Sequence, residues 1–153
     1  MNIFLQLILG WLYSHFFEYV AHRWVLHNHK IFKFAFKNHF ARHHYISRKN
    51  EMYDENYEKI INNNNLFEPV SLTVLLIAHL PVAFYFPFFF LAILYSSLSY
   101  YIIHRKSHID VGWGKKWLPW HAEHHMGKNQ HINWGVRLPI MDMLFRTSKY
   151  NTS

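Results

Sequence analysis

Fourteen of the 153 residues are histidine, and ten of them fall in four short clusters. The clusters are His22 and His27, then His39, His43 and His44, then His104 and His108, and finally His121, His124 and His125. Imidazole is the commonest protein ligand for iron, zinc and copper. Because the chain has no cysteine, a metal ion would be held by histidine, carboxylate or water. The ten clustered imidazoles therefore predict a metal centre.

The spacing within a cluster determines which imidazoles can share an ion. Residues three or four apart lie on one face of a helix. This spacing pairs His39 with His43, His104 with His108, and His121 with His124 and His125. His44 is expected to turn away from the shared face of its cluster. His22 and His27 are five apart, so this pair needs a helix end, a π-bulge or two different ions.

Ten imidazoles are too many for one ion, because a tetrahedral site takes four ligands and an octahedral site at most six. Two ions sharing the ten fit this arithmetic. An all-histidine shell around two iron ions has neutral ligands and leaves room for O2 as a co-substrate. Zinc also accepts imidazole, so purified protein can carry zinc in place of iron.

Apolar segments flank the clusters. Residues 3–21 are about one bilayer crossing long. The second apolar stretch has no basic residue and is too long for one membrane helix at about 1.5 Å per residue. We expect a transmembrane hairpin over about 69–108, with helices at 69–80 and 87–108 and with prolines 81 and 87 supplying the break.

The distribution of charge predicts the orientation in the membrane. All 16 Lys and Arg residues lie in 23–59 or 105–149. One crossing followed by a hairpin places these segments, and all four clusters, on the same side. By the positive-inside rule this side is the cytosol, with the N-terminus outside. The chain is therefore expected to be an integral protein of a bacterial inner membrane or of the endoplasmic reticulum.

The remaining segments complete a single domain over 1–153. We expect a surface helix and a polar loop over 28–65, and a C-terminal cap over 109–153. The predicted fold is all-α: an integral membrane helical bundle with about three transmembrane helices and a cytosolic, histidine-rich, metal-binding cap. A nucleic-acid surface would favour Arg and Lys over His and would not flank a membrane hairpin. No nucleic-acid partner is expected.

The order HRWVLH, HFARHH, HRKSH and HAEHH resembles the fatty acid hydroxylase / sterol desaturase superfamily of integral-membrane di-iron oxygenases. The stretch EYVAHRWVLH is most similar to fatty acid 2-hydroxylases, and the short chain resembles bacterial carotene hydroxylases. Residues 133–147 resemble the family's closing motif. The chain departs from the family pattern in having three residues between His39 and His43 instead of two, Met141 in place of a common Trp, and Arg146 in place of a common Gly.

The resemblance implies a di-iron oxygenase that hydroxylates an unactivated C–H bond of a membrane lipid, with a fatty acyl chain as the first candidate and O2 as co-substrate. Electrons would come from a cytosolic donor such as a ferredoxin or a cytochrome b5, because the chain shows no haem-binding or flavin-binding motif. Its basic surface can dock an acidic donor. Membrane topology and contact with lipid headgroups explain the same surface equally well.

Glu18 is a candidate support for the metal ligands. It lies one turn before His22 in an otherwise apolar helix. A buried acid in a membrane is costly and is usually paired. Arg23 or a histidine is the expected partner.

Three further residues are candidates to contact the ligands. Glu123 lies between ligands and can accept a hydrogen bond from an imidazole, or it is a solvated acid. His131 follows the last cluster and is a candidate neighbour of the metal ligands. Asn133 either orients a ligand or is a turn residue before Gly135.

Several alternatives remain open from the sequence. A desaturase uses the same centre, and carotenoid or sterol substrates fit the same pattern. A family member without activity would be explained by the irregular second cluster. A non-catalytic protein for metal transport or storage belongs to another class, but a transporter places ligands at mid-membrane, where only His79 lies. His15, His29 and His79 are interpreted as isolated polar residues. The oligomeric state does not follow from the sequence.

Overall fold

The computed structural model describes residues 1–61 and 63–149 of the chain, and these residues form helices and loops without a strand. Three helical segments are long and apolar enough to cross a membrane: Ile3–Leu26, Phe67–Tyr85 and Pro87–Ile109. At about 1.5 Å per residue, even the shortest is close to the thickness of the hydrocarbon core. The predicted all-α membrane bundle with three spanning helices is confirmed.

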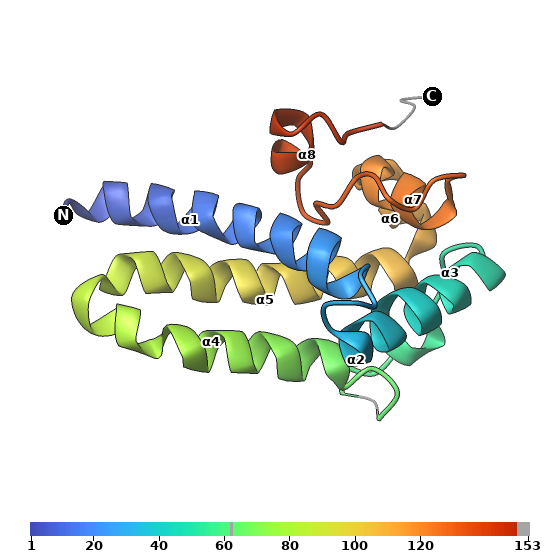
Figure 1. Cartoon of the computed structure of the whole chain (residues 1–153), viewed down its shortest axis with the longest axis horizontal. Helices are drawn as coiled ribbons and strands as arrows, with labels where there is room; N and C mark the ends of the chain where they lie inside the picture. Colours follow the sequence, from blue (N-terminus) through green and yellow to red (C-terminus); the bar gives the residue numbers. More distant parts are fainter. Residues whose placement is uncertain (62, 150–153) are drawn as a thin grey trace.

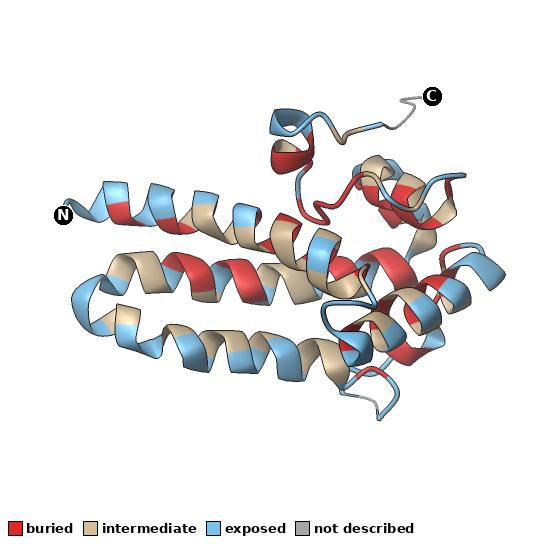
Figure 2. Ribbon diagram, viewed as in Figure 1, coloured by how far each residue is buried: buried red, intermediate tan, exposed pale blue. Residues whose placement is uncertain are grey.

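The three long helices are α1 (Ile3–Val20), α4 (Phe67–Tyr85) and α5 (Pro87–Ile109). Helix α5 packs against both α1 and α4, which lie on either side of it (Figure 1). Much of the surface of α1 and α4 is exposed (Figure 2), including the large apolar side chains of Phe4, Val74 and Phe84. Extended apolar surface of this kind suits contact with lipid.

Helices α1 and α5 approach each other closely at Gly10. A Cβ atom added there would lie 2.6 Å from the carbonyl oxygen of Phe89 and 2.8 Å from the Cβ of Ala92. Small residues permit this kind of backbone approach between membrane helices. A side chain at Gly10 would push the two helices apart.

The hairpin between α4 and α5 turns at one place. Helix α4 continues through Pro81 to Tyr85, so the predicted break at Pro81 is wrong. The chain leaves helical geometry at Phe86, with φ −136° and ψ 68°, and Pro87 begins α5. Membrane helices accommodate proline because neighbouring groups and small local adjustments satisfy the freed backbone. Proline at the first position of α5 carries no such cost, since its missing N–H would be unpaired there.

Shorter elements gather at the end of the bundle opposite the N-terminus and the α4–α5 turn (Figure 1). They are the π-helix η1 (Ala21–Leu26), α2 (Lys33–Phe36), the π-helix η2 (Lys37–His44), α3 (Tyr45–Lys49), the 3-10 helix η3 (Glu55–Tyr57), α6 (Val111–Trp117) and α7 (Pro119–Met126). The expected surface helix thus occupies 33–49, and its middle part is π-helical. The last helix, α8 (Ile140–Leu144), packs against α1.

The carboxylate of Asp142 organises the C-terminal segment, which packs against α1. This carboxylate accepts the N–H groups of Trp134, at 2.8 Å, and Gly135, at 2.7 Å, and the hydroxyl of Thr147, at 2.7 Å. Trp134 packs with Tyr19 of α1 in a small buried apolar cluster. The backbone on either side of Asn133 is therefore held in place beside the end of α1.

Candidate metal centre

Nine of the ten predicted ligands form two groups of buried imidazoles, and within each group one ring nitrogen per residue lies within 4.8 Å of all the others. We call these groups A and B. Group A consists of His22, His27, His39, His44 and His124. Group B consists of His43, His104, His108 and His125. Nitrogens bound to one ion at about 2.1 Å lie roughly 3–4 Å apart, so each group has the dimensions of a site for one ion.

Two pairs of adjacent residues place the groups side by side. His43 and His44 point into different groups, as do His124 and His125. Successive side chains point about 100° apart around a helix at 3.6 residues per turn, so one helical turn can face two sites. The rings of His44 and His125 stack with centroids 4.1 Å apart. Groups A and B are therefore in direct contact.

Two π-helical turns bring together histidines that are five residues apart. His22 lies in η1 and His27 directly follows it, whereas His39 and His44 both lie in η2. A π-helix has i→i+5 periodicity, which explains why both pairs converge on group A. The π-bulge considered for His22 and His27 is confirmed. The expectation that His44 turns away is wrong, because η2 absorbs the extra residue between His39 and His43 and returns His44 to the site.

All ten imidazoles are buried, each 7% exposed or less. Burial, followed by the repulsion of neighbouring imidazoles, lowers the pKa of six of the imidazoles that lie outside the spanning helices. These are His27, His39, His44, His121, His124 and His125. They are neutral at physiological pH, and the neutral imidazole is the form that binds metal.

This burial predicts how metal-free protein responds to acid. The folded-state pKa of these six imidazoles lies below the unfolded value of about 6.5. The unfolded chain therefore binds more protons at low pH than the folded protein does. The free energy of unfolding is unaffected by these six groups above pH ~6.5 and decreases as the pH falls below that value. We expect the melting temperature of metal-stripped protein to drop between about pH 7 and pH 5. A melting temperature that is constant over this range would contradict the neutral, buried assignment.

Backbone carbonyls hold three of the rings by their Nδ1 atoms. The donor–acceptor pairs are His22 with Trp134 O at 2.5 Å, His108 with Met52 O at 2.7 Å, and His124 with Ile132 O at 2.6 Å. A carbonyl oxygen only accepts, so the proton lies on Nδ1 and the Nε2 lone pair is free to bind a metal. Two of the three carbonyls flank Asn133 in the fastened C-terminal segment.

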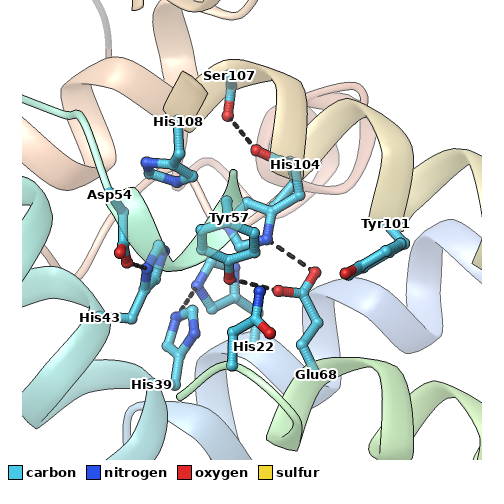
Figure 3. Close-up of polar contacts among 12 residues, drawn as sticks. His22, His39, His43, Asp54, Tyr57, Glu68, Tyr101, His104, Ser107 and His108 are labelled. Carbon is cyan, nitrogen blue, oxygen red and sulfur yellow. Dashed lines mark hydrogen bonds and ion pairs between the residues drawn. The ribbon is translucent and has the colours of Figure 1, made fainter. Parts of the chain in front are cut away.

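Two carboxylates hold group B in the same way. Asp54 accepts from Nδ1 of His43 at 3.0 Å, and Glu68 accepts from Nδ1 of His104 at 2.9 Å (Figure 3). Glu68 also accepts a short hydrogen bond from the hydroxyl of Tyr57. Burial alone would raise the pKa of Asp54, but its hydrogen bond and attraction to His43 and its bonds from Asn56 lower it to about 2. Carboxylates in this position orient ligating imidazoles and increase their basicity.

Replacing Asp54 by asparagine tests this role. The Asn56 N–H and side-chain amide both lie on Oδ1 of Asp54, at 3.0 and 2.8 Å. The new amide keeps its oxygen there and turns its NH2 group toward His43. His43 Nδ1 would then accept, and its Nε2 would carry the proton. We expect metal affinity to fall about 10–100-fold in equilibrium metal titration. Asp110→Asn, at an exposed site, is the matched control, and equal affinities for the two variants would contradict the role.

Buried nitrogens without hydrogen-bond partners test whether a metal fits. In the described part of the chain these include Nε2 of His43, His104 and His124, and both ring nitrogens of His27 and His125. In group A, the Nε2 atoms of His22 and His39 lie 2.9 Å apart. Buried polar atoms are almost always partnered. A cation bound by each group would satisfy the Nε2 atoms of His43, His104 and His124 and one ring nitrogen of His27 and of His125, so the residues fit a pair of metal ions.

His121 is the one predicted ligand outside both groups. It is fully buried beside group B, with Nε2 3.2 Å from Nε2 of His108 and its ring centroid 4.6 Å from that of His125. Its ring thus contacts group B without belonging to it. Metal binding by all ten histidines stays a prediction that this geometry supports.

Glu18 is paired, but with neither Arg23 nor a close histidine. Its carboxylate accepts the N–H groups of Val136, at 2.6 Å, and Arg137, at 3.2 Å, and forms a salt bridge to Arg137 Nε at 2.8 Å. His15 lies farther away, at 4.0 Å. Glu18 thus supports His22 indirectly, because it anchors the segment whose Trp134 carbonyl holds that ring.

The other three candidates lie around the centre without bonding to a ligand. The Glu123 carboxylate lies against Gly127, where an added Cβ would be 2.3 Å from Oε1. His131 is exposed and packs its ring 5.8 Å from that of His27. Asn133 has a left-handed φ of 56° and pairs its amide with the backbone of Lys149, at 2.6 and 2.7 Å. The Asn133 side chain thus holds the C-terminal segment and bonds to none of the described ligands.

The residues that hold the ligands were only partly visible in the sequence. Glu68 is the one acid of the second apolar stretch, and a lone acid at a membrane boundary signals a paired group. Asp54 lies among several acids of a polar loop and gives no such signal. The carbonyl acceptors at Met52, Ile132 and Trp134 depend on backbone position and not on residue type.

A cavity of about 600 Å3 lies between α1, α4 and α5 and reaches the centre. Its walls include the apolar side chains of Phe17, Leu75 and Ile93, and its inner end includes His22 and His39. The cavity is open on its α4 side, because Val74 lines it and is 59% exposed. Its volume is in the usual range for small-ligand sites, about 300–1,000 Å3.

Together the fold and the site define a helical membrane protein with a buried, histidine-rich metal-binding centre. The fatty acid hydroxylase family model matches residues 7–147, which cover all four histidine clusters. The chain belongs to the fatty acid hydroxylase family. Membership implies an oxidoreductase that hydroxylates its substrate and uses a metal cofactor. Searches among curated proteins and solved structures found no match to the chain.

Proposed function

We propose that the protein is a di-iron oxygenase that hydroxylates an unactivated C–H bond of a membrane lipid, with a fatty acyl chain as substrate. The observation that carries this proposal is the continuity of the lipid-exposed apolar cavity with His22, His39 and His43. An acyl chain can enter from the bilayer and bring a methylene group to groups A and B without crossing water.

The chain's own residues prepare the site for this reaction. Two bound iron ions would supply the activation of O2, and the substrate C–H, O2, two electrons and two protons would become C–OH and water. Groups A and B would hold the ions with neutral imidazoles. The carbonyls and carboxylates at Nδ1 orient five of these rings, those of His22, His43, His104, His108 and His124. The apolar walls exclude water, which would otherwise quench a strong oxidant.

The electrons are proposed to come from a ferredoxin or a cytochrome b5 on the cytosolic side. The supporting feature is charge: the Lys and Arg residues flank the ends of the spanning helices that carry the ligands and are absent from residues 60–104. An acidic redox protein would be attracted to such a surface. The same bias supports a cytosolic location of the centre.

Metal transport receives less support from the structure. In the described residues both imidazole groups lie at one end of the bundle, so no second group offers a relay across the membrane. His79, the mid-membrane candidate, is hydrogen-bonded to Tyr13. An inactive family member is also disfavoured, because η2 explains the irregular second cluster that suggested it. A desaturase would use the same groups and differ in how the substrate is positioned.

Lipid profiling tests the proposal. Cells that express the intact protein should accumulate hydroxylated lipids that are absent from cells expressing His124→Ala. His124 belongs to group A and is fully buried. His29→Ala is the matched control, because His29 is exposed and outside both groups, and it should retain the wild-type lipid profile.

Three results would contradict the assignment. A wild-type profile equal to that of His124→Ala, with an electron donor present and iron bound, would exclude the hydroxylase. New double bonds in place of hydroxyl groups would establish the desaturase. Movement of iron across vesicles without consumption of O2 would establish a transporter.

A further inference from the structure

The membrane-embedded end of the cavity contains a polar contact that the proposed chemistry does not use. Tyr13 of α1 lines the cavity there, with Ala78 of α4. The Tyr13 hydroxyl lies 2.9 Å from Nε2 of His79, which is also on α4. This hydrogen bond joins two helices that otherwise pack chiefly on α5.

The direction of the hydrogen bond follows from the other ring nitrogen. Nδ1 of His79 donates to the carbonyl of Leu75 at 2.8 Å, so Nε2 carries a lone pair and Tyr13 donates to it. An unpaired hydroxyl or imidazole would be costly in hydrocarbon. Each group therefore stabilises the other, and the pair holds the phenol ring across the gap between α1 and α4.

Packing contacts around Tyr13 and His79 restrict the movement of side chains at this end of the cavity. The Tyr13 ring packs 5.5 Å from the ring of Phe89, and the ring of Phe17 packs 6.2 Å from that of His79. Less than one turn beyond Tyr13, α1 closes onto α5 at Gly10. An acyl chain whose reacting carbon lies at the metal ligands would extend along the cavity to the Tyr13 phenol and then to the contact between the two helices.

The length of the cavity follows from the distance along α1 between two of its lining residues. Tyr13 and His22 both line it and are nine residues apart, which is about 14 Å along a helix. An extended chain of single bonds advances about 1.2 Å per bond. The space between the metal ligands and Tyr13 thus accommodates about a dozen bonds of a straight chain.

We propose that the Tyr13–His79 pair is the floor of the substrate cavity and selects acyl chains by length. This inference rests on the proposed function. The substrate is an unbranched acyl chain, and the hydroxylated carbon lies about a dozen bonds from its terminal methyl group. A longer tail would collide with the phenol ring, and a shorter one would leave part of the apolar wall without contacts.

Removal of either partner should lengthen the cavity. In Tyr13→Ala and His79→Ala we expect the hydroxylated products to shift to chains about two to four carbons longer, at about 1.2 Å per bond. Tyr95→Ala is the matched control, since Tyr95 lies on α5, is 68% exposed and does not line the cavity. Tyr13→Phe keeps the ring and should shift the length less than Tyr13→Ala.

A binding measurement separates this inference from the catalytic one. Saturated fatty acids from dodecanoic to docosanoic acid are added to the purified protein in nanodiscs, and the melting temperature is recorded for each. Wild type should show an optimum length, and Tyr13→Ala should move it upward. If the optimum and the product length are unchanged in folded Tyr13→Ala and His79→Ala, the floor assignment fails. If Tyr13→Ala shifts the optimum chain length for binding while the wild-type protein makes no hydroxylated lipid, the floor assignment stands and the hydroxylase proposal is rejected.

Discussion

Replacing His44 or His104 by alanine is expected to lower bound iron from about two ions per chain to about one and to abolish lipid hydroxylation. His44 belongs to group A and His104 to group B. Each group alone has the dimensions of a site for one ion. Each variant removes one ligand from one site, which weakens metal binding there, and leaves the other site intact. Oxygen activation by an iron pair needs both sites. Metal analysis of the purified variants, with product analysis alongside, measures the two effects.

The expected result depends on the separation of the groups. His29→Ala should retain both ions, because its exposed imidazole belongs to neither group. A variant lacking both His44 and His104 should bind no iron. If either single variant lost both ions, the ten imidazoles would act as one undivided site, and the assignment of one ion to each group would be wrong.

Replacing Glu18 by alanine is expected to reduce the free energy of unfolding by about 3–5 kcal/mol, the usual cost of leaving one partner of a buried ion pair unpaired. Glu18 is 9% exposed and Arg137 is 8% exposed. The substitution leaves the guanidinium without its carboxylate and two backbone N–H groups without an acceptor. The segment that carries the Trp134 carbonyl would loosen, so iron affinity should fall as well. Chemical unfolding in detergent and iron titration measure these effects.

A second substitution distinguishes loss of the ion pair from loss of packing. Glu18→Ala combined with Arg137→Leu removes both charges and should recover part of the lost stability. Glu55→Ala, at an exposed site, should change the free energy of unfolding by no more than about 0.5 kcal/mol. An equally small effect of Glu18→Ala would show that the buried pair does not anchor the C-terminal segment.

The sequence predicts the chemistry of the centre well because ligand type is a local property. Helical spacing predicts the pairing of ligands less well: His104 and His108 share a group as expected, but the expected pairings of His39 with His43 and of His124 with His125 are wrong. The four clusters, the three spanning helices and the shared end of the bundle all follow from short patterns of residues. The π-helical turns are less visible. A spacing of five at His22 and His27 indicates one. The HxxxHH pattern at residues 39–44 also fits an α-helix, so the π form of η2 was not predicted.

Features that depend on the path of the backbone could not be predicted. The carbonyls that hold His22 and His124 belong to Trp134 and Ile132, whose side chains have no part in those bonds. The partner of Glu18 is likewise more than a hundred residues away, at Arg137. The predicted helix break at Pro81 was wrong because a helix in a bilayer tolerates a proline that would end many helices in water.

The composition of groups A and B also sets the order of events during biosynthesis. Each group needs a histidine from α7, and the rings of His22 and His124 need carbonyls that follow α7. A nascent chain that ends before residue 121 contains neither group in full. A metal ion held by either complete group would therefore bind only after α7 has left the ribosome, so metal loading would be a late step of biosynthesis.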